Sequence, residues 1–561
     1  MSKSITRSGG IPVILALGLL SLAAPVAALA AAPPQTLGDL VRAGKRDSVL
    51  AAITSPDVNV NEKAPDGSTA LMWATFNVDH ELVRALLKAG AKADVANIYG
   101  ATALTEAIKV EDLELVRVLL AAGANVDSPN PDNQTALMLA ISNGSLPIAK
   151  LLVEHGADVN AIEKFRNQNA LMWAAGGNQP DIVDLLLAHG AKNVNLRAKD
   201  DDWPRQMTSE PRAQFSSRQT GGLTALLYAT RSGCYRCVVA LVKAGADVNK
   251  PNPDGVTPLI NALDNKRFDI AMFLLDKGAN PHTWDMSGRT PVYVAVDMNS
   301  FRGGGGPGGG PGGAGGRGAA GAAAEAPPPP VPAVTAMDVV NRLIGMGVDV
   351  NHQLTRKRPY GAGRGRFADY DMRGGVGPLM VATMSHDHEA MQVLLAHGAE
   401  VDLPNVFQMT PLMLAAGMSG TGRAAGGAPA PLPGDPQARA IKTIDLLLDA
   451  GANVNAQVLD SRTHTATLMA YVAGRDQEGR TALFAAAEGG RDRVVKHLLE
   501  RGADPKIRDA TGKTALDAAR AVPAAAPAAA GAAAGAAEAA RNSRAAVVAL
   551  LEPLTPKSAA L

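Results

Sequence analysis

The chain has 561 residues, of which 47% are hydrophobic but only 4% aromatic, so its apolar content is mostly alanine, valine and leucine. Its 54 lysines and arginines nearly balance its 53 aspartates and glutamates, giving a formal net charge of +1. This balance excludes a general nucleic-acid-binding protein, which needs a basic excess to displace the counterions of the phosphate backbone.

The N-terminus has the three parts of a secretory signal peptide. Lys3 and Arg7 supply a positive start, residues 11–24 are apolar, and residues 28–30 (Ala-Leu-Ala) form a small-residue cleavage site. We therefore expect residues 1–30 to be removed and the protein to be periplasmic or secreted. The alternative is an uncleaved N-terminal membrane anchor, because no charge interrupts the apolar stretch; its proline and alanine-rich end favour cleavage.

After a linker and a degenerate capping repeat in residues 31–63, the sequence repeats about every 33 residues. Units open with Thr-Ala-Leu or Thr-Pro-Leu, as at Thr69, Thr102 and Thr135, and close as at Gly90-Ala91. Such a period is the signature of stacked repeats, each of which buries its apolar face against its neighbours. We count eleven units. Their central apolar positions are Leu71, Leu104, Leu137, Leu171, Leu226, Leu259, Val292, Leu379, Leu412, Leu483 and Leu516.

Each position of a unit has a physical interpretation. The glycine of Asp66-Gly67 supplies the positive φ of a tight turn, and Thr69 caps a first helix by accepting a backbone N–H. Leu71 lies on the buried face of that helix. A second helix with its own leucine and valine stripe follows and ends at Gly90 in a left-handed cap.

The units resemble ankyrin repeats, with Asp254-Gly255-Val256-Thr257-Pro258-Leu259 as a close match to the opening of the family pattern. The resemblance implies an all-α fold, an α-solenoid of about eleven stacked helix-turn-helix repeats with hairpin fingers. It covers nearly the whole mature chain, with the repeats in residues 64–300 and 334–520.

Three interruptions lie inside units, between the first and second helices. They occupy residues 301–333, 419–439 and 522–541 and consist of glycine, proline and alanine tracts. Such tracts bury too little apolar surface to order themselves, so we expect flexible or disordered loops, with some helix in the alanine-rich third. Residues 521–561 are then an alanine-rich insertion followed by a C-terminal capping helix.

Three other interruptions lie between units, at the turn that projects as a hairpin finger in ankyrin repeats. Residues 198–220, 354–373 and 457–476 hold six of the chain's twenty aromatic residues, and the middle segment has six basic residues against two acidic ones. Aromatic residues and arginines on loops are typical of interaction surfaces; the alternative is that they pin the loops to neighbouring repeats. The candidate partner-binding residues are Trp203, Phe215, Arg356, Arg358, Tyr360, Arg364, Arg366, Phe367, Tyr370 and Tyr471.

The only cysteines, Cys234 and Cys237, form a Cys-x-x-Cys pair at the start of a second helix. They are open to three interpretations: core packing, a local disulfide in an oxidising compartment, or a redox pair whose thiol pKa is lowered by the helix N-terminus. Cys237 falls where other units place a buried leucine or isoleucine, which favours a structural use. Val238 in place of histidine excludes covalent haem attachment, and no matching histidine spacing indicates zinc.

Other polar residues indicate no catalytic site. His386-Asp387-His388-Glu389 lies at a short turn between two helices, where we expect the side chains to point into solvent. Glu106 and Asn261 occupy packing positions, and we expect each to hydrogen-bond to an adjacent repeat, with ligand contact in the groove as the alternative. The sequence contains no nucleophile triad or phosphate-binding glycine loop, so we expect no cofactor and no metal.

The sequence therefore predicts a non-enzymatic, exported scaffold that binds a partner protein through its concave groove and finger loops. We expect a monomer that binds no nucleic acid and has no membrane segment beyond the signal peptide. Two alternatives remain open. One is thiol redox activity of the cysteine pair, and the other is an accessory or protective role for a neighbouring exported enzyme.

Overall fold

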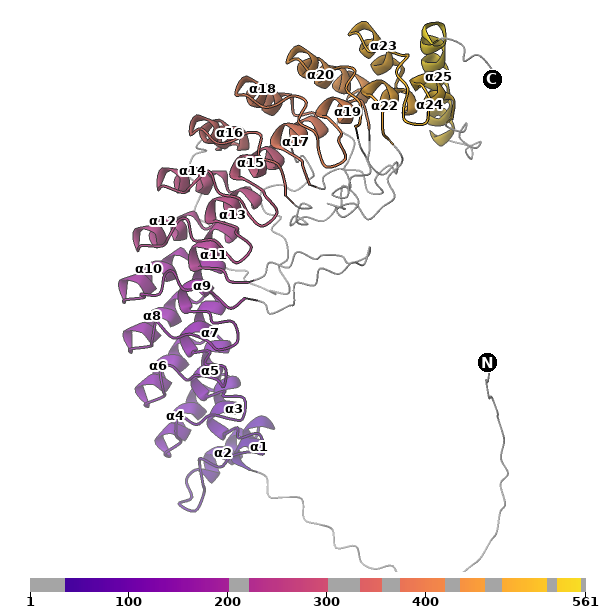
Figure 1. The fold of residues 1–561 in the computed structure, drawn as a ribbon. Coiled ribbons are helices and arrows are strands. Elements are labelled where there is room, and N and C mark those ends of the chain that lie inside the picture. Colours follow the sequence, from indigo (N-terminus) through magenta and orange to yellow (C-terminus); the bar gives the residue numbers. More distant parts are fainter. Residues whose placement is uncertain are drawn as a thin grey trace, which may run out of the picture.

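The computed structural model is a curved arc of stacked helix pairs (Figure 1). It describes residues 36–200, 221–300, 333–355, 374–418, 434–459, 477–521 and 532–555. Within these ranges there are 24 α-helices and no β-strand, so the predicted all-α solenoid is confirmed. The helices form twelve pairs, which are the degenerate unit and the eleven repeats that the sequence period indicates.

The degenerate unit is α1 (Leu37–Arg42) with α2 (Arg46–Ala52). The repeat pairs, in chain order, are α3 (Ala70–Phe76) with α4 (His80–Lys88), α5 (Ala103–Lys109) with α6 (Leu113–Ala121), α7 (Ala136–Ser142) with α8 (Leu146–Glu154), α9 (Ala170–Gly176) with α10 (Pro180–Ala188), α11 (Ala225–Ser232) with α12 (Tyr235–Lys243), α13 (Pro258–Asp264) with α14 (Phe268–Asp276), α15 (Pro291–Ser300) with α16 (Ala336–Gly345), α17 (Pro378–Met384) with α18 (His388–Ala396), α19 (Pro411–Ala415) with α20 (Pro436–Asp449), α22 (Ala482–Glu488) with α23 (Asp492–Glu500), and α24 (Ala515–Ala521) with α25 (Ala532–Leu551).

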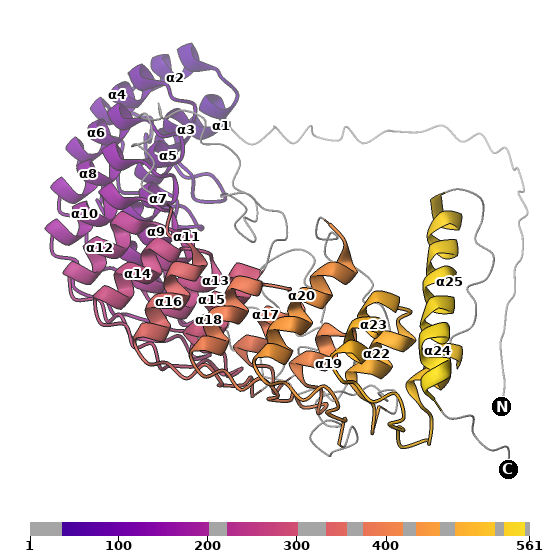
Figure 2. The same ribbon diagram turned by 90° about the horizontal axis from the view of Figure 1, so that it is seen from above.

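The two helices of each pair take different places in the arc. In Figure 1 the first helices, such as α5 and α13, lie on its inner side, and the second helices, such as α6 and α14, lie on its outer side. Seen from above in Figure 2, the pairs continue the same curve to the C-terminal end, where the long helix α25 stands beside α24. The inner side of the arc is therefore built from the first helices and the loops that precede them.

The first helices begin where the repeated threonine predicts. Thr69 Oγ1 accepts the N–H of Met72 at 3.4 Å, and the equivalent threonines of most other units cap in the same way. In the fourth unit Asn169 takes the place of threonine and accepts the N–H of Met172 at 3.0 Å. Since these side chains satisfy a donor that the helix leaves unpaired, each first helix has a defined start.

The second helices end at the repeated glycine and hold the core together. Gly90 has φ 95°, and the N–H of Ala91 then donates to the carbonyl of Leu86 at 2.9 Å. Leu71 of the first helix and Leu86 of the second are both buried, as the periodic pattern predicts. Because every unit repeats these positions, one continuous apolar core runs the length of the arc.

At six boundaries within the described residues, an asparagine between units ties one closing turn to the next. Asn160 Nδ2 donates to the carbonyl of Gly190 at 3.1 Å, and its Oδ1 accepts the N–H of Lys192 at 2.9 Å. At the same position Asp127 and Asp402 accept the corresponding N–H but have no side-chain donor for the glycine carbonyl. The same two bonds as at Asn160 are made by Asn61, Asn195, Asn249, Asn351 and Asn455.

Two boundaries differ from the sequence prediction. Residues 419–439 do not all belong to a loop, because α20 begins at Pro436, with Asp435 capping it through the N–H of Gln437 at 2.9 Å. The prediction overlooked a helix start, an Asp followed by Pro at the first helical position. The alanine-rich segment is helical from Ala532 onward, since alanine has the highest helix propensity.

The segment expected to be a signal peptide, residues 1–30, lies outside the described residues, as do residues 301–332 of the first insertion. Among the helices that the structure describes, none combines the length and the apolar character needed to cross a bilayer.

Candidate functional site

The loops between successive helix pairs form a row of hairpins on the inner side of the arc (Figure 1). In the second unit, Asn97 donates its N–H to the carbonyl of Ala101 at 2.9 Å, and Gly100 donates back to Asn97 at 2.9 Å. Adjacent hairpins are joined as well, since the N–H of Ile98 donates to the carbonyl of Asp66 in the preceding hairpin at 3.0 Å. Backbone hydrogen bonds thus hold the row in register.

The three finger insertions interrupt this row at hairpin tips. In an ordinary unit the closing pair, such as Asn97 and Ala101, is four positions apart in the sequence. In the interrupted units the pair is 25, 22 and 22 positions apart, yet each N–H···O distance is 3.0 Å. The pairs are Ala198–Leu223, Leu354–Val376 and Val458–Arg480. The base of each finger therefore keeps the geometry of an uninterrupted hairpin.

The ten partner-binding residues predicted from the sequence all fall in these insertions, outside the described residues. They are Trp203, Phe215, Arg356, Arg358, Tyr360, Arg364, Arg366, Phe367, Tyr370 and Tyr471.

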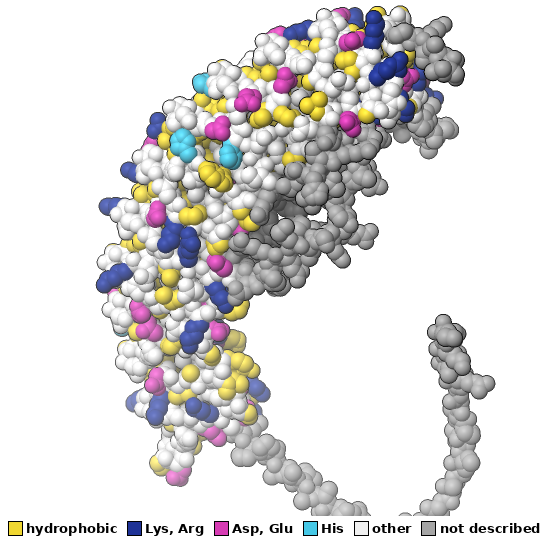
Figure 3. All heavy atoms as spheres, in the orientation of Figure 1, with side chains coloured by type: hydrophobic (Ala, Val, Ile, Leu, Met, Phe, Trp, Pro, Cys, Tyr) yellow, Lys and Arg dark blue, Asp and Glu magenta, His cyan; other side chains and the backbone are white. Residues whose placement is uncertain are grey.

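A second set of apolar side chains is exposed at the tips of uninterrupted hairpins. We name it the hairpin-tip row: Ile98, Tyr99, Phe165, Trp284 and Met286. The exposed fractions of Tyr99 and Phe165 are both 70%, and that of Trp284 is 60%. Figure 3 shows hydrophobic side chains on the inner edge of the arc over its N-terminal helices. The sequence interpretation missed this row, although large apolar residues at turns that favour glycine or asparagine were the signal.

Phe165 lies on a loop whose backbone N–H groups are held by a side chain of the same loop. The buried carboxylate of Glu163 accepts the N–H groups of Phe165 at 2.7 Å, Arg166 at 2.8 Å and Gln168 at 2.9 Å. The Arg166 guanidinium lies 5.7 Å from the centroid of the Phe165 ring. An exposed aromatic ring on a pre-ordered loop loses little entropy on binding, which suits an interface anchor.

Trp284 lies next to the base of the second finger. Its ring stacks on His352 of the following hairpin, with centroids 5.6 Å apart and planes 28° from parallel. His352 lies two positions before Leu354, the first residue of the insertion. The hairpin-tip row and the finger bases are therefore parts of one edge.

The inner faces of the first helices add aromatic and cationic groups beside this edge. Trp73 and Phe76 form an edge-to-face pair with centroids 6.1 Å apart, and Arg42 lies 5.9 Å from the Trp73 ring. Arg231 lies 5.0 Å from the ring of Tyr228, and burial lowers the pKa of Arg231. Arginine and aromatic side chains are enriched in protein interfaces.

Asn261 and Glu106, the two polar residues at packing positions of the first helices, make different contacts. Asn261 donates to the carbonyl of Leu227 at 2.8 Å and to Thr230 Oγ1 at 2.7 Å, both in the preceding unit, which confirms the expected bond to an adjacent repeat. The prediction was wrong for Glu106, which accepts from Lys109 Nζ at 2.7 Å within its own helix. A cation one turn away satisfies this carboxylate without a neighbouring unit.

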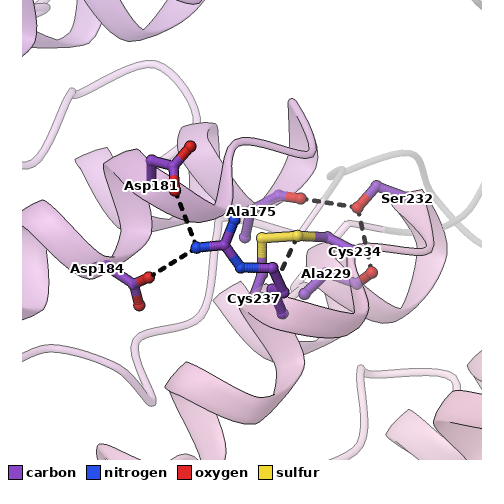
Figure 4. Close-up of a disulfide and its surroundings, with 8 residues drawn as sticks. Ala175, Asp181, Asp184, Ala229, Ser232, Cys234 and Cys237 are labelled. Atoms are coloured by element: carbon purple, nitrogen blue, oxygen red, sulfur yellow. Dashed lines mark hydrogen bonds and ion pairs between the residues drawn. A yellow bond between two sulfur atoms is a disulfide. The ribbon is translucent and has the colours of Figure 1, made fainter. Parts of the chain in front are cut away.

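Cys234 and Cys237 form a disulfide at the N-terminus of α12 (Figure 4). Cys234 is the N-cap residue, and its sulfur accepts the N–H of Cys237 at 3.2 Å. Both residues are buried, with 2% and 0% of their surface exposed. Because thiol–disulfide exchange needs access to a sulfur atom, this geometry favours a structural disulfide over a redox pair.

The expectation of a solvated turn at residues 386–389 was wrong for the two histidines, whereas Glu389 is exposed as expected. His386 Nδ1 lies 2.8 Å and His388 Nε2 lies 3.0 Å from Thr443 Oγ1, because α20 of the next unit packs against this turn. Burial is the main cause that lowers the pKa of His386 to about 4, and it lowers the pKa of His388 as well. Across the described ranges, no three His, Cys, Asp or Glu side chains are grouped as metal ligands.

Comparison with known proteins gave both family and individual matches. Models of the families described as "Ankyrin repeats (3 copies)" and "Ankyrin repeats (many copies)" match more than half of the chain, over residues 37–130, 111–200, 207–285, 226–302 and 472–519. The individual relatives match over short segments, and the chain spans less than half the length of each.

Among these relatives, the mouse B-cell lymphoma 3 protein homolog is 35% identical over 79 residues, which are 14% of this chain and 18% of the relative. The mouse RelA-associated inhibitor is 36% identical over 77 residues, 14% of this chain and 9% of the relative. Human protein phosphatase 1 regulatory subunit 27 is 40% identical over 70 residues, 12% of this chain and 46% of the relative. With the family matches and eleven helix pairs of one geometry, the chain belongs to the ankyrin-repeat family.

Proposed function

We propose that this protein is a non-enzymatic scaffold that binds a partner protein through the hairpin-tip row, the finger insertions and the inner groove. The hairpin-tip row is the observation that carries the proposal. It leaves Tyr99, Phe165 and Trp284 mostly in water on hydrogen-bonded loops, where they stabilise no core. Aromatic residues of this kind supply most of the binding free energy of protein interfaces.

The relatives support this class of function. Two of them are named as an inhibitor and as a regulatory subunit, and both names describe action on another protein. Repeat arrays of this type also offer extended concave surfaces for binding. Ankyrin repeats and these relatives are typical of interaction modules rather than of enzymes.

The test is affinity capture from the exported fraction with matched variants. Tyr99→Ser, Phe165→Ser and Trp284→Ser combined remove three anchors from loops without altering the core. Tyr235→Ser is the control, since Tyr235 is an exposed aromatic on the outer helix α12. We expect the triple variant to lose the partner and the control to retain it. If the triple variant is folded by circular dichroism and still captures the same partner, the hairpin-tip row is not the binding surface.

A variant without residues 354–373 tests the finger separately. If the second finger contributes to binding, its deletion weakens capture while the hairpin base closes as in an ordinary unit. Should the captured partner be an exported enzyme, its activity with and without the scaffold tests the accessory role directly.

We also propose that the scaffold acts after export, in the periplasm or outside the cell. The signal-like N-terminus supports this location, and so does the Cys234–Cys237 disulfide, since disulfides persist mainly in oxidising compartments. Mass spectrometry of the cell fractions tests it. An exported chain that lacks residues 1–30 is expected, whereas an intact chain in the membrane fraction would favour the uncleaved anchor.

A further inference from the structure

A cationic cluster lies apart from the hairpin-tip row, where the helix–helix turns of the eighth, ninth and tenth units meet. We name it the turn cluster: His386 and His388 at the turn between α17 and α18, Arg439 and Lys442 on α20, and Arg491 at the N-cap of α23. The function proposed above makes no use of these residues.

One hydroxyl group determines which nitrogen of each imidazole donates. Thr443 Oγ1 donates to the carbonyl of Arg439 at 3.0 Å, so it can only accept from the two rings. His386 then donates from Nδ1 and His388 from Nε2, at 2.8 and 3.0 Å. Burial lowers the pKa of both rings, which favours their neutral form and makes the second ring nitrogen of His386 an acceptor, and His388 also hydrogen-bonds to the backbone of Arg439.

Arg491 is a half-buried cation with few partners. Its guanidinium packs over Gly417, where a Cβ atom would lie only 2.5 Å from Cζ. Within the described residues its one hydrogen bond runs to the carbonyl of Ala415 at 3.5 Å, and no carboxylate forms an ion pair with it. Burial therefore lowers the pKa of Arg491 with no opposing cause. A guanidinium has five N–H donors, so most of its capacity is unused.

The positive charges act on one another across the turn cluster. Apart from burial and His388, the causes that lower the pKa of His386 are the charges of Arg439 and Arg491. After burial, the next cause that lowers the pKa of His388 is Lys442. Positive charges from three consecutive units therefore repel one another, and a bound anion would reduce this repulsion.

The carboxylates nearest in sequence have partners of their own. Asp387 caps α18 and accepts from Asn299 Nδ2 at 2.6 Å, and Asp435 pairs with Arg493. Asp492 accepts from the side chains of Gln437 and Ser543. The neighbouring insertion, residues 419–433, contains one arginine and no Asp or Glu. Within the described residues, no carboxylate forms an ion pair with Arg491 or Lys442, although Asp387 acts on His388.

We propose that the turn cluster binds a phosphate-class oxyanion, either inorganic phosphate or a phosphate monoester. Arg491 supplies the fork of N–H donors, and Arg439 and Lys442 balance the negative charge. The neutral ring of His386 accepts hydrogen from a protonated phosphate oxygen. Inorganic phosphate keeps such a hydrogen at neutral pH, a monoester keeps it only in the fraction that is protonated near its second pKa of about 6, and sulfate has none, so this arrangement favours phosphate over sulfate.

Arg491→Gln is the central variant, because the fold already uses glutamine at this position. In the fourth unit Gln179 is the equivalent N-cap residue, and its Nε2 donates to the carbonyl of Ile141 at 2.8 Å. The variant therefore keeps a side-chain donor to the preceding unit and removes the charge. Arg267→Gln is the matched control, since Arg267 takes the same position in the sixth unit and donates to the carbonyl of Ser232 at 3.5 Å, without the histidine pair.

Calorimetric titration of the full chain with inorganic phosphate, glycerol phosphate and sulfate, at matched ionic strength, measures the binding. We expect wild type and Arg267→Gln to bind phosphate or the monoester more tightly than sulfate, and Arg491→Gln to weaken this binding about tenfold or more. Lys442→Gln is expected to weaken phosphate binding too. Because Lys442 is exposed, this variant should fold normally, so it tests the cluster even if Arg491→Gln misfolds. The proposal is overturned if wild type binds neither phosphate compound, if sulfate binds equally well, or if Arg267→Gln loses as much affinity as Arg491→Gln.

Discussion

The buried ion pair at Arg289 offers the sharpest test of how this array is stabilised. Arg289 precedes the capping threonine of the seventh unit, and only 6% of its side chain is exposed. It donates to Asp285 Oδ2 at 2.6 Å and to Asp264 Oδ1 at 2.7 Å. Burial alone would lower the pKa of Arg289, but the two carboxylates outweigh it and raise the pKa.

Replacing Arg289 by methionine keeps the apolar stem and leaves two carboxylates without their cation. Asp264 is 26% exposed and regains water, whereas Asp285 is 2% exposed and does not. Removing one partner of a buried pair typically costs 3–5 kcal/mol. Since Asp285 keeps the N–H groups of Ser287 and Arg289 as donors, we expect the lower end, about 3 kcal/mol.

Arg480→Met is the matched control, because Arg480 holds the same repeat position in the tenth unit. It is more exposed, and its contacts with Glu488 and Asp509 are longer, at 3.2 and 3.4 Å. Asp509 also keeps Thr511 and Lys513 as donors, so we expect a loss of only about 1 kcal/mol.

Urea unfolding followed by helical circular dichroism measures both losses. Hydrogen exchange at the amides of Met286 and Gly288, which bond across and within the hairpin, locates the effect, since repeat arrays can open locally. Adding Asp285→Asn to Arg289→Met is expected to recover most of the stability. The reasoning is refuted if Arg289→Met costs no more than the control, or if the double variant is no more stable than the single one.

Three further outcomes are expected. Asp127→Asn restores asparagine at one of the positions where aspartate replaces it and adds a donor for the next glycine carbonyl, and we expect it to raise the free energy of unfolding by about 0.5–1 kcal/mol in urea titrations. The pKa of His386 is lowered in the folded state from 6.5 to about 4, so the unfolded chain binds the proton more tightly. The free energy of unfolding is then at its full value above about pH 6.5 and falls by about 2–3 kcal/mol as the pH drops toward 4. In pH-dependent unfolding experiments, the His386→Asn variant should lose most of this pH dependence. Reduction of the Cys234–Cys237 disulfide removes a short cross-link. Unfolding with and without reductant should therefore show that the free energy of unfolding falls by at most about 2 kcal/mol.

Much of the fold could be predicted because each unit repeats its local signals. The threonine caps, the closing glycines and the leucine positions all depend on contacts within a few residues, and their period counted the units correctly. The start of α20 at Pro436 was also encoded locally, by Asp435 before proline, but the glycine and proline tract before it obscured the signal.

What could not be predicted depends on contacts between units. The burial of His386 requires Thr443, which lies 57 positions further along the chain, behind an insertion that breaks the period. Asn261 and Glu106 share one repeat position, and only the structure shows that the preceding unit offers Thr230 to the first, whereas Lys109 in its own helix satisfies the second. Exposure at the hairpin-tip row likewise depends on how neighbouring loops stack.

The preserved closing pairs beneath the fingers have a consequence for how such a protein can change. Lengthening a loop from about 4 to about 25 residues costs only about 2 kcal/mol of closure entropy, a small penalty for an array with a continuous core. A hairpin closed by a pair such as Leu354–Val376 can therefore accept foreign segments of very different length and composition. The tips act as independent attachment points, so recognition can diverge, or be redesigned by loop exchange, while the helical scaffold stays the same.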